Sequence, residues 1–292
     1  MLIKVKSGES LIKIFKPNTL DEAKKLLKSE KCTNILAGGT DLIIDIRKNK
    51  KTPNSLIDIG SIDELKNIKE EEGFISIGAM VTFSELYESE IIRRNFTSLY
   101  ECSKAMGSPQ IRNAATIGGN VANGASAADS IPCLMSLNSE IVLESSNETR
   151  VIKLAEYFKN YNIEHLRNDE IITKFIIPKD NSISGYYKLG KRNSLAIARI
   201  SVAVSISMDN SIINDINVVI GAAGKVPFKV ESIKNLVINE NKSVLFNDKV
   251  LNLLEEAVYN SIKGRSTVNF KKEAVKGVYK NALYNALKIE GV

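Results

Sequence analysis

Two glycine-rich turns are the features of this 292-residue sequence best suited to bind a charged small molecule. The first is Leu36-Ala37-Gly38-Gly39-Thr40-Asp41, directly after a short apolar run, and the second is Ala115-Thr116-Ile117-Gly118-Gly119-Asn120. Glycines let backbone N–H groups converge without Cβ clashes into a concave nest of donors for phosphate oxygens, and each threonine hydroxyl adds a donor. Two such turns predict a binding site for the two phosphates of a dinucleotide.

The second turn lies inside a stretch of about 25 residues, from Gly107 to Ile131, that is rich in Gly, Ala, Ser and Asn. Small residues at this density indicate that the backbone closely approaches a ligand or another backbone segment. Asp129 closes the stretch, and its carboxylate is suited to accept from a sugar hydroxyl or a ring N–H. Neither turn matches a known nucleotide fingerprint, so each also fits a tight turn without a ligand.

The conventional catalytic sets are missing from the sequence. His165 is the single histidine, and Cys32, Cys102 and Cys133 form neither a CxxC motif nor a Cys/His cluster. Histidine triads, two-histidine metal sites, zinc sites and chain-borne iron–sulfur clusters are therefore not indicated. We expect His165 to be structural and the thiols to be reduced and buried. Redox or other hard chemistry would have to come from a cofactor.

Composition places the chain among ordinary globular proteins, with 43% hydrophobic and 25% charged residues. The net charge of +6 is spread among acidic residues, and the densest basic run, Arg47 to Lys51, reads as a solvated loop. The sequence lacks the pattern that would indicate nucleic-acid binding, a basic patch interleaved with aromatic residues. The N-terminus has no signal-peptide pattern, and no run of 18 apolar residues occurs. We expect a soluble, cytoplasmic protein with neither nucleic-acid nor membrane partners.

The elements that must position the two turns follow from periodicity and capping. Capping-box spacings at 19–22, 61–64 and 82–85 predict three helix starts, and 42–46 and 91–106 read as helical. Strands are predicted at 35–37, 56–59, 74–78, 141–143 and 171–177. A polar break at 178–181 precedes strands at 186–188, 201–206 and 216–220 and helices at 249–262 and 272–288. The fold class is therefore α+β, with a domain over 1–178 (subdomains of about 1–58 and 59–178) and a second over 182–292.

The motifs then point to a family. The string from Ser108 to Asn120 (SPQIRNAATIGGN), together with the segment from Ala37 to Leu42 (AGGTDL), resembles the FAD-binding medium subunit of the molybdenum hydroxylases. The resemblance extends over essentially the whole chain, including Phe15-Lys16-Pro17 and the segment from Tyr187 to Arg192. It implies a vanillyl-alcohol-oxidase (PCMH) type FAD-binding domain. A smaller α+β domain like the C-terminal domain of carbon monoxide dehydrogenase flavoprotein would follow it.

The resemblance implies these FAD-binding residues by position. Leu36 to Asp41 and Thr116 to Asn120 would hold the pyrophosphate, with Asn123 beside them, and Asp129 would reach the ribityl or adenosine portion. Ile171 and Ile172 would pack near the adenine or the flavin, with core packing as the alternative. Lys188 would lie near the flavin ring, where a cation stabilises the anionic reduced form, and an ordinary surface lysine is its alternative.

The family function implied is electron transfer. Electrons would pass from two-iron two-sulfur clusters on a small subunit to FAD and then to NAD, with molybdopterin on a large subunit and a heterotrimer that could dimerise. The segments Asn123-Gly124-Ala125 and Ala128-Asp129-Ser130 resemble the bacterial xanthine dehydrogenase branch, although Gly124-Ala125-Ser126 replaces the Ala-Ser-Pro of other branches. This favours a purine substrate for the assembled enzyme.

Three alternatives remain open at this point. The chain could serve another molybdenum hydroxylase, of the carbon monoxide, nicotinate or aromatic acyl-CoA type. It could be a nucleotide-binding docking module without redox turnover. It could also be a stand-alone flavoenzyme of the enolpyruvylglucosamine reductase type, against which the lack of an obvious catalytic acid argues.

Overall fold

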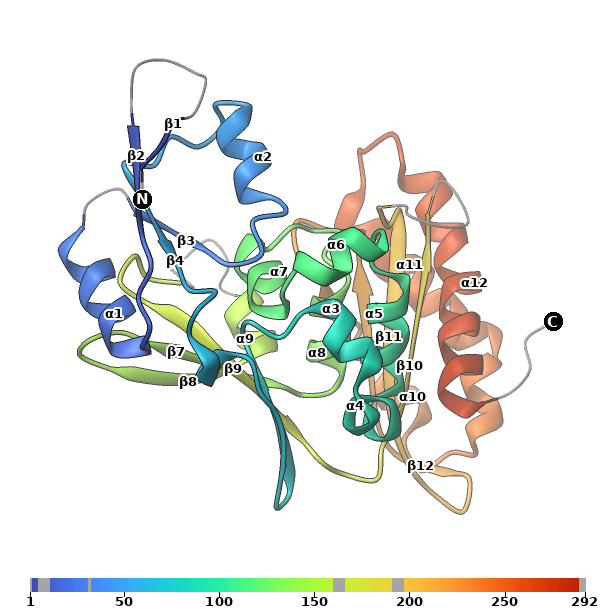
Figure 1. The fold of residues 1–292 in the computed structure, drawn as a ribbon. Helices are drawn as coiled ribbons and strands as arrows, with labels where there is room; N and C mark the ends of the chain where they lie inside the picture. The colour runs from blue at the N-terminus through green and yellow to red at the C-terminus, as the bar shows by residue number, and fades with distance from the viewer. Residues whose placement is uncertain (1, 5–10, 31–32, 160–165, 191–196, 289–292) are drawn as a thin grey trace.

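The computed structural model describes residues 2–4, 11–30, 33–159, 166–190 and 197–288, so the predictions made for Cys32 and His165 lie outside the described residues. In the described part of the chain, three separate sheets form, flanked by helices (Figure 1). Strands and helices occur in both halves of the chain, and two of the sheets are antiparallel throughout. This confirms the predicted α+β class.

The first sheet has the order β1-β2-β4-β3. Its strands are β1 (Leu2–Lys4), β2 (Leu11–Phe15), β3 (Thr33–Leu36) and β4 (Ser55–Asp58), and its helices are α1 (Leu20–Ser29) and α2 (Leu42–Arg47). Strands β2 and β3 run parallel to β4. The Thr19 hydroxyl accepts from the N–H of Glu22 and starts α1 as predicted. The first glycine turn is therefore a connection from a parallel strand to a helix.

The second sheet is antiparallel, with the order β5-β6-β9-β7-β8. Its strands are β5 (Ile68–Glu71), β6 (Phe74–Gly78), β7 (Glu140–Glu144), β8 (Thr149–Lys153) and β9 (Ile171–Pro178). Between β6 and β7 the chain forms α3 (Phe83–Glu88), α4 (Glu90–Asn95), α5 (Thr97–Ala105), α6 (Pro109–Ala114), α7 (Ile117–Asn123) and α8 (Ser130–Ser136); α9 (Leu154–Lys159) follows β8. The second glycine turn lies among these short helices.

The third sheet is an antiparallel meander, β10-β11-β12-β13. Its elements are β10 (Ile183–Leu189), β11 (Ile200–Asp209), β12 (Ile212–Gly221), β13 (Phe228–Lys229), α10 (Ser232–Val237), α11 (Asp248–Ile262) and α12 (Val268–Leu287). One face packs on α11 and α12, and the other meets α5 and α8 (Figure 1). The third sheet therefore borders the same region that holds the second turn.

Two predicted elements differ from the structure. The spacing at 61–64 yields only a short 3₁₀ helix, Asp63–Leu65, because the Glu64 carboxylate accepts from the N–H of Leu20 instead of capping its own helix. The single helix expected over 91–106 is broken at Phe96, which leaves helical geometry and separates α4 from α5. At 82–85 the capping box is complete, with Thr82 and Glu85 bonding each other's backbone.

Candidate functional site

The first glycine turn connects β3 to α2 and is pressed against a neighbouring loop. A methyl group placed on Gly38 would lie 1.7 Å from the carbonyl oxygen of Ala114, so only glycine permits this approach. Gly39 has φ of +69°, a conformation that favours glycine. None of the backbone N–H groups of residues 38–41 donates a hydrogen bond to another described residue. The turn therefore presents unpaired donors, as expected of an anion nest.

The second turn starts α7, and the N–H groups of Ala115 and of residues 117–120 are already engaged within the protein. The N–H of Ile117 donates to the Val81 carbonyl at 3.0 Å and that of Gly118 to the Ala79 carbonyl at 2.9 Å. The N–H of Gly119 donates to the capping Thr116 hydroxyl at 3.1 Å. The two turns are therefore not equivalent: the second supplies shape and close packing, while the first supplies the free N–H groups.

The two glycines of the second turn have different neighbours. A methyl group on Gly118 would lie 2.6 Å from the Ala79 side chain, inside the protein. On Gly119 it would lie 2.9 Å from the Thr116 hydroxyl and 3.8 Å from the Ala37 Cβ, in the gap between the two turns. Gly118 therefore serves packing, and Gly119 keeps the space between the turns open.

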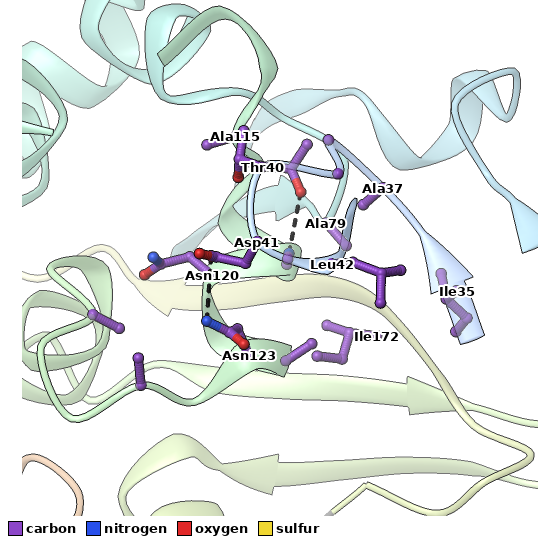
Figure 2. Close-up of a pocket in the computed structure, with 18 of the residues that line it drawn as sticks. Ile35, Ala37, Thr40, Asp41, Leu42, Ala79, Ala115, Asn120, Asn123 and Ile172 are labelled. Carbon is purple, nitrogen blue, oxygen red and sulfur yellow. Dashed lines mark hydrogen bonds between the residues drawn. The ribbon is translucent and has the colours of Figure 1, made fainter. Parts of the chain in front are cut away.

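Both turns line one cavity of about 620 Å³. Figure 2 shows Asp41 of the first turn beside Asn120 and Asn123 of α7, where the Asn123 amide donates to the Asp41 carboxylate at 3.2 Å. Fourteen of the sixteen predicted site residues line the cavity: Ala37, Gly38, Gly39, Thr40, Asp41, Thr116, Gly118, Gly119, Asn120, Asn123, Asp129, Ile171, Ile172 and Lys188. Leu36 and Ile117 do not line it, because their side chains pack into hydrophobic clusters behind the turns.

Asp129 and Lys188 form a buried ion pair at the cavity wall. The Lys188 Nζ donates to Asp129 Oδ2 at 2.5 Å, and their side chains are 10% and 6% exposed. The Tyr186 hydroxyl donates to the other carboxylate oxygen, Oδ1, at 2.7 Å. Burial raises the pKa of the Asp129 carboxyl, and Lys188 and Tyr186 offset part of that rise. Lys188 is thus not the ordinary surface lysine that was its alternative.

A second charged group stabilises another part of the cavity wall. Glu170 is 2% exposed and accepts two hydrogen bonds from Arg150, at 2.6 and 2.7 Å, and a third from the backbone N–H of Arg167 at 2.9 Å. Burial alone would raise the pKa of Glu170, but these donors hold it below its ordinary value. The group fixes residues 166–170, which line the cavity directly before Ile171.

Several cavity residues were not predicted from the sequence. Asn34, Ile35 and Leu42 flank the first turn, and Ala125, Ala127 and Ala128 belong to the small-residue stretch noted in the sequence. The residues with no sequence signal come from distant segments: Ala79, Met80, Met106, Ile111, Leu166 and Asn168. Except for Asn168 these side chains are apolar, and with Ile35 and Ile172 they give the cavity walls on which flat rings can pack.

In the part of the chain that the structure describes, no three His, Cys, Asp or Glu side chains come together as metal ligands. Cys102 and Cys133 are reduced and buried, and burial raises the pKa of the Cys133 thiol well above its ordinary value. No described helix is long and apolar enough to cross a membrane.

Comparison with known proteins gives consistent similarities. Residues 9–180 match the family described as the FAD-binding domain in molybdopterin dehydrogenase, and residues 185–286 match the CO dehydrogenase flavoprotein C-terminal domain. The chain is 36% identical to the nicotinate dehydrogenase FAD-subunit of Eubacterium barkeri, over 95% of this chain and 97% of that protein. It is 28% identical to the xanthine dehydrogenase FAD-binding subunit of Escherichia coli O157:H7, over 87% of each.

A solved structure has the same fold. Carbon monoxide dehydrogenase from Hydrogenophaga pseudoflava superposes with a TM-score of 0.86 at 24% identity, covering 95% of this chain and 97% of that chain. This agreement, with the two domain matches, confirms the expected order of an FAD-binding domain followed by a CO dehydrogenase flavoprotein C-terminal domain.

Proposed function

The chain belongs to the family of FAD-binding medium subunits of molybdenum hydroxylases, and we propose that its cavity holds FAD and passes electrons between partner subunits and NAD. As a member it is an oxidoreductase subunit and a flavoprotein. The finer parts of this proposal are the residues that hold the cofactor, the partners, the electron acceptor and the substrate. The division into domains over 1–178 and 182–292 is also proposed, supported by the start of the third sheet at Ile183.

The residues around the cavity fit FAD in three respects. Its two phosphates need donors, and the unpaired N–H groups of 38–41 lie where the glycines of both turns leave space. Its flat rings need apolar walls, which Ile35, Ile111 and Ile172 offer. Its ribityl hydroxyls need a buried polar partner, and Asp129 faces the cavity. Bound there, FAD would supply the redox chemistry for which the sequence provides no side chains.

Within this proposal each group of residues has a separate task. Residues 37–41, with Gly119, Thr116 and Asn120, would seat the pyrophosphate, while the bond between Asn123 and Asp41 holds the first turn against α7. Lys188 would meet the flavin as one half of an ion pair, so Asp129 offsets much of the field of its charge. Lys188 would then stabilise the anionic reduced flavin less than an unpaired cation would.

We further propose that the chain works in a heterotrimer with an iron–sulfur small subunit and a molybdopterin large subunit, which could dimerise. The relatives support this by name: they are FAD-subunits, medium chains and, in one case, a subunit of a dehydrogenase complex. The described part of the chain offers no cluster of metal ligands of its own. In the proposed complex, electrons would enter from the iron–sulfur subunit.

For the substrate of the assembled enzyme we propose a nitrogen heteroaromatic compound. The sequence motifs favour a purine, as in a xanthine dehydrogenase, whereas 36% identity to the nicotinate subunit supports a pyridine carboxylate at least as well. Both compounds contain a nitrogen heteroaromatic ring. The substrate would bind the molybdenum subunit. The sequence of this chain therefore supports a class of substrate, the nitrogen heteroaromatic compounds, and does not identify one compound.

The experiment begins with the purified chain. Its absorption spectrum and the chromatography of what heat denaturation releases should show about one FAD per chain. In the presence of co-purified partners, xanthine or nicotinate should then reduce the bound flavin. NADH, the reduced form of the proposed acceptor, should also reduce it. A chain that neither contains nor takes up FAD overturns the proposal. Bound flavin that neither NADH nor the partners reduce would favour the docking module.

A further inference from the structure

Strand β10 presents alternate side chains to the FAD-binding domain. Ser184, Tyr186 and Lys188 are spaced by two and therefore lie on one face of the strand. The Ser184 hydroxyl accepts from the N–H of Ser98 at 3.1 Å, and the next two side chains on that face both reach Asp129. The third sheet thus contributes a row of three polar contacts across the boundary between the domains.

The opposite face of β10 is fixed by α12. A methyl group on Gly185 would lie 2.1 Å from the carbonyl oxygen of Ala282, so strand and helix are in close backbone contact. The Asn285 amide donates to the carbonyl of Tyr186 at 2.8 Å. The position of the Tyr186 ring, itself 2% exposed, is therefore set by the C-terminal helix.

The contacts from β10 favour the charged form of Asp129, because Lys188 and Tyr186 oppose the rise in its pKa that burial causes. It is 5% exposed, and each of its carboxylate oxygens takes one hydrogen bond from β10. Its side chain makes no capping bond at the start of α8, and Asp129 is among the residues that line the cavity, so its carboxylate keeps acceptor capacity for a ligand there. The other titratable groups close to this cluster are the thiols of Cys133 on α8 and Cys102 on α5, both buried.

We propose that Tyr186 is a positioning residue for the cofactor, whose hydroxyl acts through Asp129 to hold an ionised, oriented carboxylate at the cavity. FAD binding by the first domain then depends on docking of the third sheet, because both donors to Asp129 come from β10. This inference rests on the proposed function. It adds a residue that does not itself line the cavity and couples the second domain to cofactor loading.

The test is Tyr186→Phe, which removes the hydroxyl and keeps the buried ring. Tyr279→Phe is the matched control, because Tyr279 is equally buried in the second domain and its hydroxyl contacts no hydrogen-bond partner among the described residues. FAD titrations of the apo-chain between about pH 5 and 8 give the dissociation constant, and thermal unfolding without FAD gives the stability.

Tyr186→Phe is expected to weaken FAD binding by about 10-fold at neutral pH, the worth of one hydrogen bond to a charged group. Losing a donor to the carboxylate raises the pKa of Asp129 further, so the fall in affinity on acidification should begin at a higher pH than in the parent chain. Tyr279→Phe should match the parent in both respects. Asp129→Asn, which cannot ionise, should remove this acid dependence.

The outcomes separate the inference from the proposed function. A parent chain that takes up no FAD overturns the proposed function and this inference with it. Tyr186→Phe with the parent's affinity and pH profile overturns the inference alone, even if its melting temperature falls. An Asp129→Asn chain that keeps the parent's loss of FAD affinity on acidification also overturns the inference. This measurement tests the inference even if Tyr186→Phe fails to fold.

Discussion

Gly119→Ala offers the sharpest test of how the two turns would hold a pyrophosphate. The new methyl group would lie in the gap between the turns, 3.8 Å from the Ala37 Cβ, and would push a phosphate away from the N–H groups of 38–41. Each hydrogen bond to a charged group is worth about 1.5–3 kcal/mol. Losing two of them should weaken FAD binding at least about 100-fold.

The same substitution should cost the apo-chain little stability. Alanine gains about 1 kcal/mol of helix propensity over glycine inside α7. The methyl group would lie 2.9 Å from the Thr116 hydroxyl, and moving that hydroxyl would lose a cap worth about 1 kcal/mol. We expect a melting temperature close to that of the parent, measured without FAD, together with the large loss of affinity in a fluorescence titration.

Gly118→Ala is the matched control, one residue earlier in the same helix. Its methyl group would lie 2.6 Å from the Ala79 Cβ and 2.7 Å from the Ala79 carbonyl oxygen, so it overpacks the interior by about 1–3 kcal/mol. Its melting temperature should fall where that of Gly119→Ala does not. Parent-like FAD affinity in a folded Gly119→Ala chain would refute the assignment of the gap to the pyrophosphate.

Three further outcomes follow from the contacts. Asp41→Ala and Asn123→Ala should each weaken FAD binding by a few fold, and the double variant should be no worse than either, in a double-mutant cycle by titration. Glu170→Ala should lower the free energy of unfolding by about 1.5–3 kcal/mol through loss of the Arg150 bonds. Because the pKa of Glu170 is depressed, its contribution should be present above its ordinary pKa of 4.5 and vanish as the pH falls through the lower folded value, so urea unfolding of parent and variant should converge there. Gly185→Ala should separate β10 from α12 and lower both the melting temperature and FAD affinity, whereas a parent-like affinity would show that the second domain is not coupled to the site.

Local patterns were sufficient for much of the architecture. The Thr19 and Thr82 caps, the alternating strands and the two C-terminal helices depend on residues within a few positions of one another, and all form. The short helix predicted from 61–64 forms, but as a 3₁₀ helix over Asp63–Leu65 without a side-chain cap, and the Glu64 carboxylate accepts from the distant N–H of Leu20. A local capping signal therefore does not decide the type of helix when a distant group binds the same side chain.

The sequence by itself determined the family and the two glycine turns, since these reside in contiguous motifs, and the family resemblance added the more distant cavity residues Ile171, Ile172 and Lys188. Only the tertiary structure decided how they differ in role. The N–H groups of Ile117 and Gly118 donate to the carbonyls of Val81 and Ala79, whereas the four successive N–H groups of residues 38–41 have no partner among the described residues. No spacing places Tyr186 and Lys188 against Asp129, because these contacts cross 57 and 59 residues and join two domains. Burial and pairing are properties of the assembled chain, and they settle which charges face the cavity and which neutralise each other.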